Sequence, residues 1–323
     1  MKYSDVIDNS GLSEEINRLC GLPEGAVGNA SYSNKAKVAR INDALDKYWF
    51  LASESALKGT FDDTNQTALP LEKQSLVAGT NYYKISAFTN EVLQILKMSI
   101  LDDDATEFDL GREEFDDLSD FYELYSTDTA SRGIPQYWTK MGDYIYIRPC
   151  PDYSETDGLR AYVNREMAKY LFVTFTVTIA TPGVFTAATH GLALNDALIF
   201  ETDGALPTGL TADTTLYYVI STGLTADAFQ VSTTLGGTAV NTSGSQSGNH
   251  KFLKANKEPG IPVIHHPYLA RQASLPFLIA NEMGRKNDIA SLIQTDEVAI
   301  LKYWAHRDKD TRSQMTFKRR LFK

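Results

Sequence analysis

Hydrophobic and polar positions follow a helical period near both ends of the chain. After a cap at Ser31 to Ser33, apolar residues recur every three or four positions up to about Glu54, which predicts an amphipathic helix of roughly five turns. The side chains expected to face inward are Val38, Ile41, Leu45, Tyr48, Trp49 and Ala52. Those expected on the solvent side are Lys35, Lys37, Arg40, Asp43 and Lys47.

Two further helical patterns lie in the last quarter of the chain. The first runs from Pro267 to Met283, and Pro276 is expected to kink it because a proline inside a helix removes a backbone hydrogen bond. The second runs from Asp288 to Ala305, with Gln294 to Asp296 as a candidate break. The inward positions expected for the two are Leu269, Ala273, Phe277 and Ala280, and then Ile289, Leu292, Ile293, Val298, Leu301 and Trp304.

Between these helices, period-two alternation predicts strands. The clearest signal is a hairpin, in which Gln136–Lys140 and Tyr144–Arg148 flank a turn that contains Gly142. Pro149 ends it, and residues 159–166 are expected to continue the same sheet. Other strands are predicted at 68–71, 74–77, 82–85, 92–100 and 107–110, whereas 112–125 has helical spacing.

Residues 173–253 differ in texture from the rest of the chain. They carry few charges, many Thr, Ala and Gly residues, and turn signals between short apolar runs. Strands are predicted near 173–179, 197–200, 216–220, 229–231 and 250–253. Several short strands in one stretch indicate a small sandwich or barrel. Because an insertion is tolerated at an exposed loop tip, where its two ends lie close together, we expect an inserted β module.

The pattern as a whole predicts an α+β fold. A helical host domain with a β-hairpin and small sheet is expected over 1–172 and 254–306. The inserted all-β domain, sandwich or barrel-like, is expected over 173–253, and an extended C-terminal arm over 307–323.

Charge is spread unevenly over the 323 residues, whose formal net charge is −10. The stretch from Asp102 to Glu123 holds eleven carboxylates and one arginine. An acidic surface repels phosphate, so it would let DNA pass without binding it. The candidate residues for such a surface are Asp102, Asp103, Asp104, Glu107, Asp109, Glu113, Glu114, Asp116 and Asp117.

The C-terminal arm is basic, with seven Lys or Arg and two Asp between Arg307 and Lys323. Apolar residues alternate with these charges, which favours a peptide that docks into a partner's groove. Contact of Lys318, Arg319 and Arg320 with DNA phosphate is the alternative. The candidate docking residues are Arg312, Met315, Phe317, Lys318, Arg319, Arg320, Leu321, Phe322 and Lys323.

Signals for catalysis are weak. The two cysteines, Cys20 and Cys150, give no disulfide framework, and the pair His265–His266 has no further metal ligand at suitable spacing. No phosphate loop or nucleophile elbow occurs, so we expect no catalytic residue, no metal, no cofactor and no enzyme. No run approaches the ~20 apolar residues that span a bilayer, so no membrane partner is expected and assembly in a cytoplasm is the default.

Aromatic residues are frequent in the middle of the chain. They could stack on nucleic-acid bases, but lysine and arginine are not interleaved with them in the sequence, so core and interface positions are predicted. The residues concerned are Tyr82, Tyr83, Tyr122, Tyr125, Tyr137, Trp138, Tyr144 and Tyr146.

The order and spacing of several segments resemble the head-to-tail adaptor proteins of tailed bacteriophages. A helix ending in Tyr48-Trp49-Phe50 is followed by Ile134–Trp138, the strand Tyr144–Pro151, Leu159–Glu166, and Lys257–Pro262 leading into His265. The resemblance covers most of 30–172 and 254–310. The inserted module is similar to small β modules of phage tail and neck proteins, notably in 203–211 and 236–244. It occupies a loop before Lys257 that is usually short in the family.

The resemblance implies a structural protein of the virion neck. Copies of the chain, commonly twelve, would form a ring between the portal protein and the tail proteins (nozzle, tail tube or stopper). Genomic DNA would pass through the ring at ejection without sequence-specific binding. The arm would anchor in the portal, and the acidic residues would face the channel or a neighbouring subunit. The alternative is a tail surface protein whose β module binds a host receptor or glycan.

Overall fold

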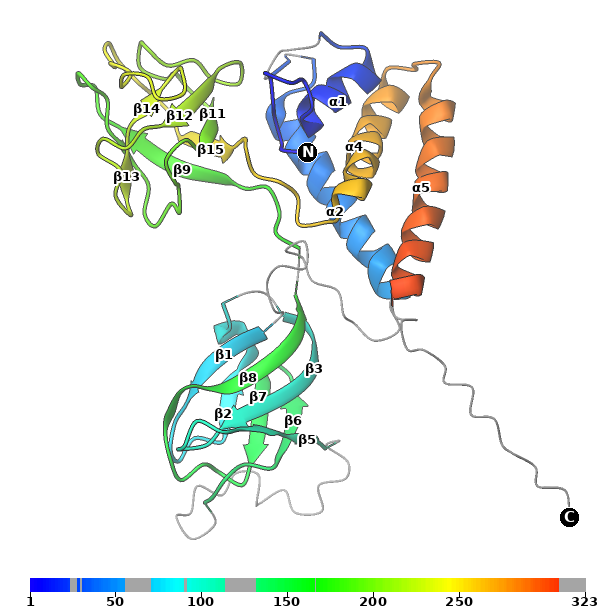
Figure 1. Cartoon of the computed structure of the whole chain (residues 1–323). Helices are drawn as coiled ribbons and strands as arrows, with labels where there is room; N and C mark the ends of the chain where they lie inside the picture. Colours follow the sequence, from blue (N-terminus) through cyan, green and yellow to red (C-terminus); the bar gives the residue numbers. More distant parts are fainter. Residues whose placement is uncertain are drawn as a thin grey trace, which may run out of the picture. The chain divides into compact units, whose positions relative to one another are not determined.

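The computed structural model describes residues 1–23, 28–29, 31–55, 71–89, 92–113, 132–165 and 167–307. The chain divides into two compact units, Met1–Ser55 with Ala168–Lys323, and Ala56–Met167 (Figure 1). The first unit holds a helical bundle and a β-barrel, and the second is a β-sandwich. The predicted α+β class and the barrel-like inserted domain are confirmed.

Four described helices form the bundle. Their bounds are Leu12–Cys20 (α1), Asn34–Ser55 (α2), His266–Ala280 (α4) and Lys286–Arg307 (α5), with a 3-10 turn η4 at Val263–His265. Helix α4 packs against α1, α2 and α5, and α2 also packs against α5. The helix predicted after Ser33 is confirmed as α2. Five of its six predicted inward positions are buried, and Trp49 is only half-buried; the buried ones are Val38, Ile41, Leu45, Tyr48 and Ala52.

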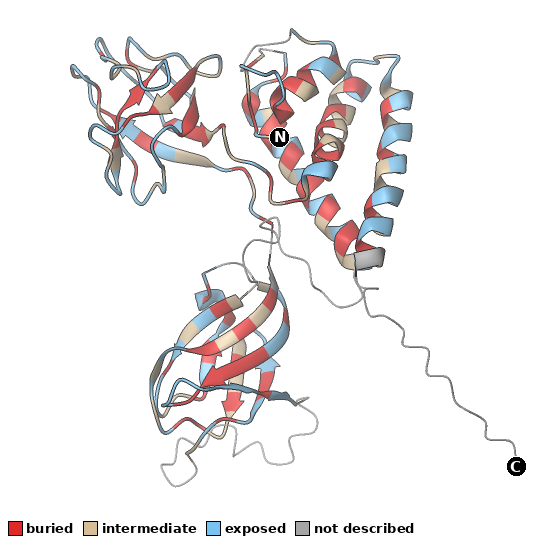
Figure 2. Ribbon diagram, viewed as in Figure 1, coloured by how far each residue is buried: buried red, intermediate tan, exposed pale blue. Residues whose placement is uncertain are grey.

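Helix α5 differs in two respects from its prediction. It runs without interruption through Gln294–Asp296, so the candidate break there is wrong. Leu292 and Val298, predicted to face inward, are 44% and 50% exposed. The buried positions are Ile289, Ile293, Ile300 and Trp304, a narrow stripe at helical spacing that faces the bundle. The Trp304 indole donates to the Tyr48 hydroxyl at 3.0 Å, which fixes this register. Much of the ribbon of α5 is exposed in the burial colouring of Figure 2, with only short buried stretches.

Helix α4 contains Pro276 within its helical span. Leu269 and Ala273 are buried as predicted, but Ala280 is exposed and Leu278 is buried in its place. Phe277 is half-buried and stacks on Tyr32 at a ring separation of 4.8 Å. Ala280 is the last residue of α4, and at this end of the helix its side chain is not covered by a neighbouring helix.

Two four-stranded sheets make up the second unit. One has the order β1-β8-β3-β4 and the other β2-β7-β6-β5, and the apolar sides of both enclose a single core. The bounds are Leu71–Leu76 (β1), Tyr82–Lys84 (β2), Val92–Leu101 (β3), Glu107–Asp109 (β4), Gly111–Arg112 (β5), Tyr137–Met141 (β6), Tyr144–Arg148 (β7) and Glu155–Arg165 (β8), with a 3-10 turn η1 at Ile85–Ala87.

The hairpin of β6 and β7 is confirmed, with Gly142 at a positive φ of 58° in its turn. By contrast, β8 does not continue the hairpin's sheet, because it lies between β1 and β3 in the other sheet. The apolar side of β8 packs on the same core as β7 but from the other sheet. Alternation shows which side of a strand is apolar, and it does not show which sheet the strand joins. Arg112, expected to start a helix, belongs to β5 and pairs with Trp138 of β6. Glu113 is not helical either, and residues 114–125 of that predicted helix lie outside the described residues.

The inserted module is a nearly closed seven-stranded sheet of order β13-β10-β9-β15-β11-β12-β14. A cluster of aromatic rings fills it, with Phe200 stacked on Tyr217 at 4.7 Å and Phe185 on Phe229 at 5.2 Å. The bounds are Phe172–Val177 (β9), Phe185–Thr186 (β10), Ala197–Thr202 (β11), Leu216–Val219 (β12), Ala228–Phe229 (β13), Val231–Ser232 (β14) and His250–Lys254 (β15).

The chain enters and leaves the barrel through neighbouring strands. β9 and β15 pair antiparallel, with Phe172 opposite Leu253, so the two ends of the module lie side by side (Figure 1). The barrel belongs to the same compact unit as the helices, whereas residues 56–167, expected within the host domain, form a unit of their own. That separation follows from the closed core of the sandwich. Arg307 is the last residue of α5, and the remainder of the predicted arm lies outside the described residues.

We expect the helical bundle to fold without the barrel. In a variant with residues 173–253 replaced by a short Gly-Ser linker, the adjacent ends of β9 and β15 require no rearrangement. The variant loses barrel–bundle contacts such as the hydrogen bond from Asn34 to the Asp213 carbonyl and the ion pair between Lys35 and Glu201, and each such loss lowers stability by about 1 kcal/mol or less. Thermal melts followed by far-ultraviolet circular dichroism check this. Collapse of the helical signal would show that the barrel is needed to fold the bundle.

Candidate functional site

Three of the predicted acidic residues form the turn between β3 and β4. Asp102 is buried, and its Oδ1 accepts backbone N–H groups from Asp104 at 3.0 Å and Thr106 at 2.8 Å. Asp103 and Asp104 are exposed at the tip. The Asp102 carboxylate therefore shapes the turn instead of projecting into solvent.

The other described acidic residues lie close to cations of their own unit. Glu107 accepts from Ser99 at 2.6 Å, Arg160 at 2.8 Å and Tyr162 at 3.2 Å. The Ser99 bond, followed by those from Arg160 and Tyr162, lowers the pKa of Glu107. Asp109 pairs with Lys97 at 2.7 Å, and Glu113 pairs with Arg148. Over the described residues these carboxylates form ion pairs, not one continuous negative surface. Glu114, Asp116 and Asp117 lie outside the described residues.

The candidate docking residues of the arm, Arg312 to Lys323, also lie outside the described residues. Their assignment therefore remains a prediction from the sequence.

A different surface appears on the outer side of the β2-β7-β6 sheet, which we call the tyrosine face. Cross-strand register places Tyr82 beside Tyr146 and Lys84 beside Tyr144. The rings of Tyr82, Tyr144 and Tyr146 lie 6.0–6.3 Å apart. The tyrosine face consists of Tyr82, Lys84, Tyr137, Tyr144, Tyr146 and Arg148.

Cations are interleaved with these rings, contrary to the expectation from sequence. The Lys84 amine lies 5.7 Å from the Tyr144 ring centre, and the Arg148 guanidinium lies 5.3 Å from that of Tyr137. Strand pairing, not sequence proximity, brings them together. Tyr82 is 53% exposed and Tyr137 is 41% exposed, whereas Tyr83 and Trp138 lie in the core as predicted. Tyr122 and Tyr125 lie outside the described residues.

The outer side of the opposite sheet has another character. There Arg160 pairs with Glu107, and Lys97 pairs with Asp109 and lies over the Tyr162 ring at 5.4 Å. Charged groups thus satisfy one another across β3, β4 and β8. The tyrosine face offers ring edges and hydroxyls instead, the chemistry that is enriched in protein interfaces.

A buried lysine organises the helical bundle. Lys37, predicted on the solvent side of α2, is fully buried and donates to Ser13 Oγ at 2.9 Å and Asn17 Oδ1 at 2.7 Å, both on α1. Burial lowers the pKa of Lys37 to about 8, although the nearby Glu14 opposes the shift. The prediction for Lys37 was wrong because a helical pattern of apolar residues places every lysine on the solvent side. The hydrogen-bond partners that allow Lys37 to be buried come from another helix.

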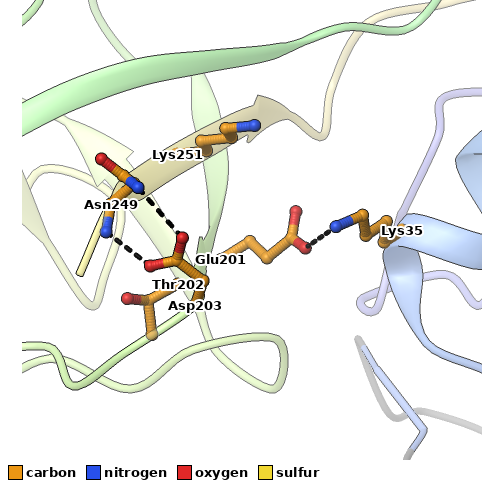
Figure 3. Close-up of a pocket in the computed structure, with 6 residues that line it drawn as sticks. All are labelled: Lys35, Glu201, Thr202, Asp203, Asn249 and Lys251. Atoms are coloured by element: carbon orange, nitrogen blue, oxygen red, sulfur yellow. Dashed lines mark hydrogen bonds and ion pairs between the residues drawn. The ribbon is translucent and has the colours of Figure 1, made fainter.

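A small polar pocket lies between α2 and the barrel in the first unit (Figure 3). Glu201 pairs with Lys35 at 3.6 Å, and Asp203 accepts two hydrogen bonds from Asn249. The pocket has a volume of about 50 Å³, which is far below the roughly 300–1,000 Å³ of small-molecule sites. These side chains therefore join barrel and bundle more readily than they would hold a sugar.

His266 and the two cysteines singled out in the sequence are buried, as side chains that support the fold commonly are. His266 is fully buried and its Nε2 lies 3.0 Å from the Ile261 carbonyl, and burial lowers its pKa to about 4. Cys20 and Cys150 are buried free thiols. Among the described residues, no three His, Cys, Asp or Glu side chains gather to hold a metal ion. No described helix is long and apolar enough to cross a membrane.

Neither the protein-family models nor the curated proteins compared with the chain give a match.

The stability of the bundle should depend on the charge of Lys37. The pKa is about 8 in the folded chain and ~10.4 in an unfolded one, so between these values the unfolded chain binds more protons. The free energy of unfolding therefore rises with pH in this window, and below pH ~8 the cost of burying the charge is fully present.

We expect the wild type to gain about 1–2 kcal/mol over Lys37→Met between pH ~8 and ~9.5. Urea unfolding of both proteins across this pH range measures the difference between their free energies of unfolding. The titration of groups that both proteins share cancels in this difference. Curves that stay parallel would show that the amine has the same pKa in the folded and the unfolded chain, which contradicts the prediction.

Proposed function

We propose that this chain is a structural adaptor of a phage virion neck, with no catalytic role. It joins the portal protein at the capsid to the tail proteins as a ring of copies around the DNA. The resemblance of the segments described above motivates the assignment. The observation that carries it furthest is the tyrosine face, a solvent-accessible aromatic surface on a separate compact unit.

The tyrosine face suits a protein partner better than a nucleic acid. The rings of Tyr82, Tyr144 and Tyr146 are tilted or edge-on to one another, with interplanar angles of 42–69°, so they offer no row of parallel planes for bases. Its two cations already lie over the Tyr144 and Tyr137 rings. The net charge of −10 opposes attraction to phosphate. Tyrosine hydroxyls and ring edges are well matched to a polypeptide surface.

The arm supplies the second part of the proposal. Its basic and apolar residues follow directly after α5, and many identical arms in a ring would add their affinities. DNA would pass the ring without specific contacts.

Removal of the arm should abolish binding to the portal. Purified protein is mixed with assembled portal, and complexes are weighed by mass photometry after size exclusion. We expect full-length chain to give a complex with several copies per portal, and a deletion of 308–323 to give none. Equal binding by both forms would remove the arm from the proposal. Absence of binding by either form would favour a tail surface protein whose barrel binds a receptor.

The tyrosine face should contribute to neck assembly without supporting the fold. The double variant Tyr82→Ser, Tyr137→Ser removes two exposed rings, and we expect about tenfold weaker assembly on portal or tail with little change in melting temperature. Leu93→Ser, Leu96→Ser on β3 is the matched control, because those residues are similarly exposed in the other sheet. Unchanged affinity for both partners in the tyrosine variant would exclude this face.

A further inference from the structure

Two consecutive apolar side chains are exposed at the end of the bundle where α4 begins. Val263 is 63% exposed and Ile264 is 73% exposed, and both belong to the 3-10 turn η4 that leads into α4. The next residue, His265, is buried, and its ring lies 4.9 Å from the ring centre of Tyr303 on α5. The turn is thus held beside the last turns of α5. We call Val263 and Ile264 the η4 patch.

The C-terminal arm begins close to this patch. Helices α4 and α5 run antiparallel, so α5 ends at the end of the bundle where η4 lies (Figure 1). Tyr303 lies one turn before Arg307, the last residue of α5, and the arm continues directly from there. The first apolar residues of the arm after Arg307 are Met315 and Phe317. The eight residues from Arg307 to Met315 can span about 26 Å, so both side chains can return to the patch.

The arm is also complementary in charge to the rest of the chain. Residues 307–323 hold seven Lys or Arg and two Asp, so they carry a net charge of +5. The whole chain has a net charge of −10, which leaves −15 on residues 1–306. The basic arm is therefore attracted to the body that carries it.

We propose that the C-terminal arm docks on the η4 patch of its own chain, with Met315 and Phe317 over the two exposed side chains. These arm residues are separated by one position, so in an extended segment both point to the same side. Docking removes the apolar patch from water, which is favourable. Since arm and patch belong to one chain, the arm is present at an effective concentration of about 1 mM, so even a weak contact is populated.

The contact deepens the proposed function and rests on it for its consequence. The arm that anchors in the portal would first leave the η4 patch, so the free chain holds its portal anchor in a competing position. Because only chains with a free arm bind, the apparent affinity for the portal falls with the fraction of arms that are free. The docking itself is measured on the full chain without portal. Its failure is therefore distinguishable from failure of the adaptor role.

Thiol labelling measures whether the arm covers the patch. In Ile264→Cys the introduced thiol reacts with N-ethylmaleimide and mass spectrometry follows the rate, while the native Cys20 and Cys150 are buried. We expect labelling of the full chain to be about threefold to tenfold slower than that of the same variant without residues 308–323. An effective concentration of about 1 mM and a dissociation constant of about 0.1–0.5 mM give this ratio. Equal rates in the two forms overturn the proposal.

Ile279→Cys is the matched control on the bundle. Ile279 is 55% exposed, but it lies near the other end of α4, about 20 Å from the patch along the helix. Its labelling should be equally fast with and without the arm. Equal protection of Ile264→Cys and Ile279→Cys would show that the arm collapses on the bundle without a defined site, which overturns the proposal.

Substitutions in the arm identify the docked residues. Met315→Ser with Phe317→Ser should raise the labelling rate of Ile264→Cys to that of the truncated chain. Leu321→Ser with Phe322→Ser is the control within the arm and should leave the protection in place. The reverse result overturns the assignment of the docked pair. Protection that grows with protein concentration shows that the arm of a second copy occupies the patch, which overturns docking within one chain. Thermal melts check that each variant keeps its fold.

Discussion

The first turn of α2 joins three separate stretches of the chain through hydrogen bonds. The Asn34 amide accepts from the Tyr3 hydroxyl at 2.9 Å and donates to the barrel carbonyl of Asp213 at 2.9 Å. One turn later, Lys37 binds α1. Since a buried polar group without a partner costs about 1–3 kcal/mol, losing any one of these partners would destabilise the first turn of α2 without by itself unfolding the bundle. Helices α4 and α5 pack on the same helix.

The sequence was sufficient to predict the elements that are determined by a hydrophobic pattern within their own residues. Helix α2, the β6–β7 hairpin and the barrel-like module needed only local alternation and turn residues. It was insufficient where a partner distant in the chain decides the outcome. Lys37 is buried because α1 brings Ser13 and Asn17, Leu292 and Val298 are exposed because α5 meets the bundle on one side, and β8 joins β1 because both sheets share a core. The two-residue strands β10, β13 and β14 are too short to show a period.

The candidate site follows the same rule. The tyrosines were visible in the sequence, but the cations beside them were not, because Lys84 and Arg148 arrive by strand register. The acidic residues were visible as a charge run, yet Glu107 and Asp109 lie in a lattice of ion pairs on one sheet. The tyrosine face remains the surface that the described residues offer for assembly, and it belongs to the compact unit formed by residues 56–167.

The pairing of β9 with β15 determines how the barrel responds to mechanical load. Because Phe172 and Leu253 are opposite each other, tension that separated the barrel's two connections would break the ladder one hydrogen bond at a time, as in a zipper. The connection after β15 runs on to the helical bundle, where the Ser4 N–H donates to the Ala255 carbonyl at 3.0 Å, and Lys257 donates to the Lys169 carbonyl of the connection before β9 at 2.6 Å. These bonds clamp the two connections, so a force transmitted along the helices bypasses the barrel. The module can therefore be mechanically fragile while the protein that carries it withstands strain.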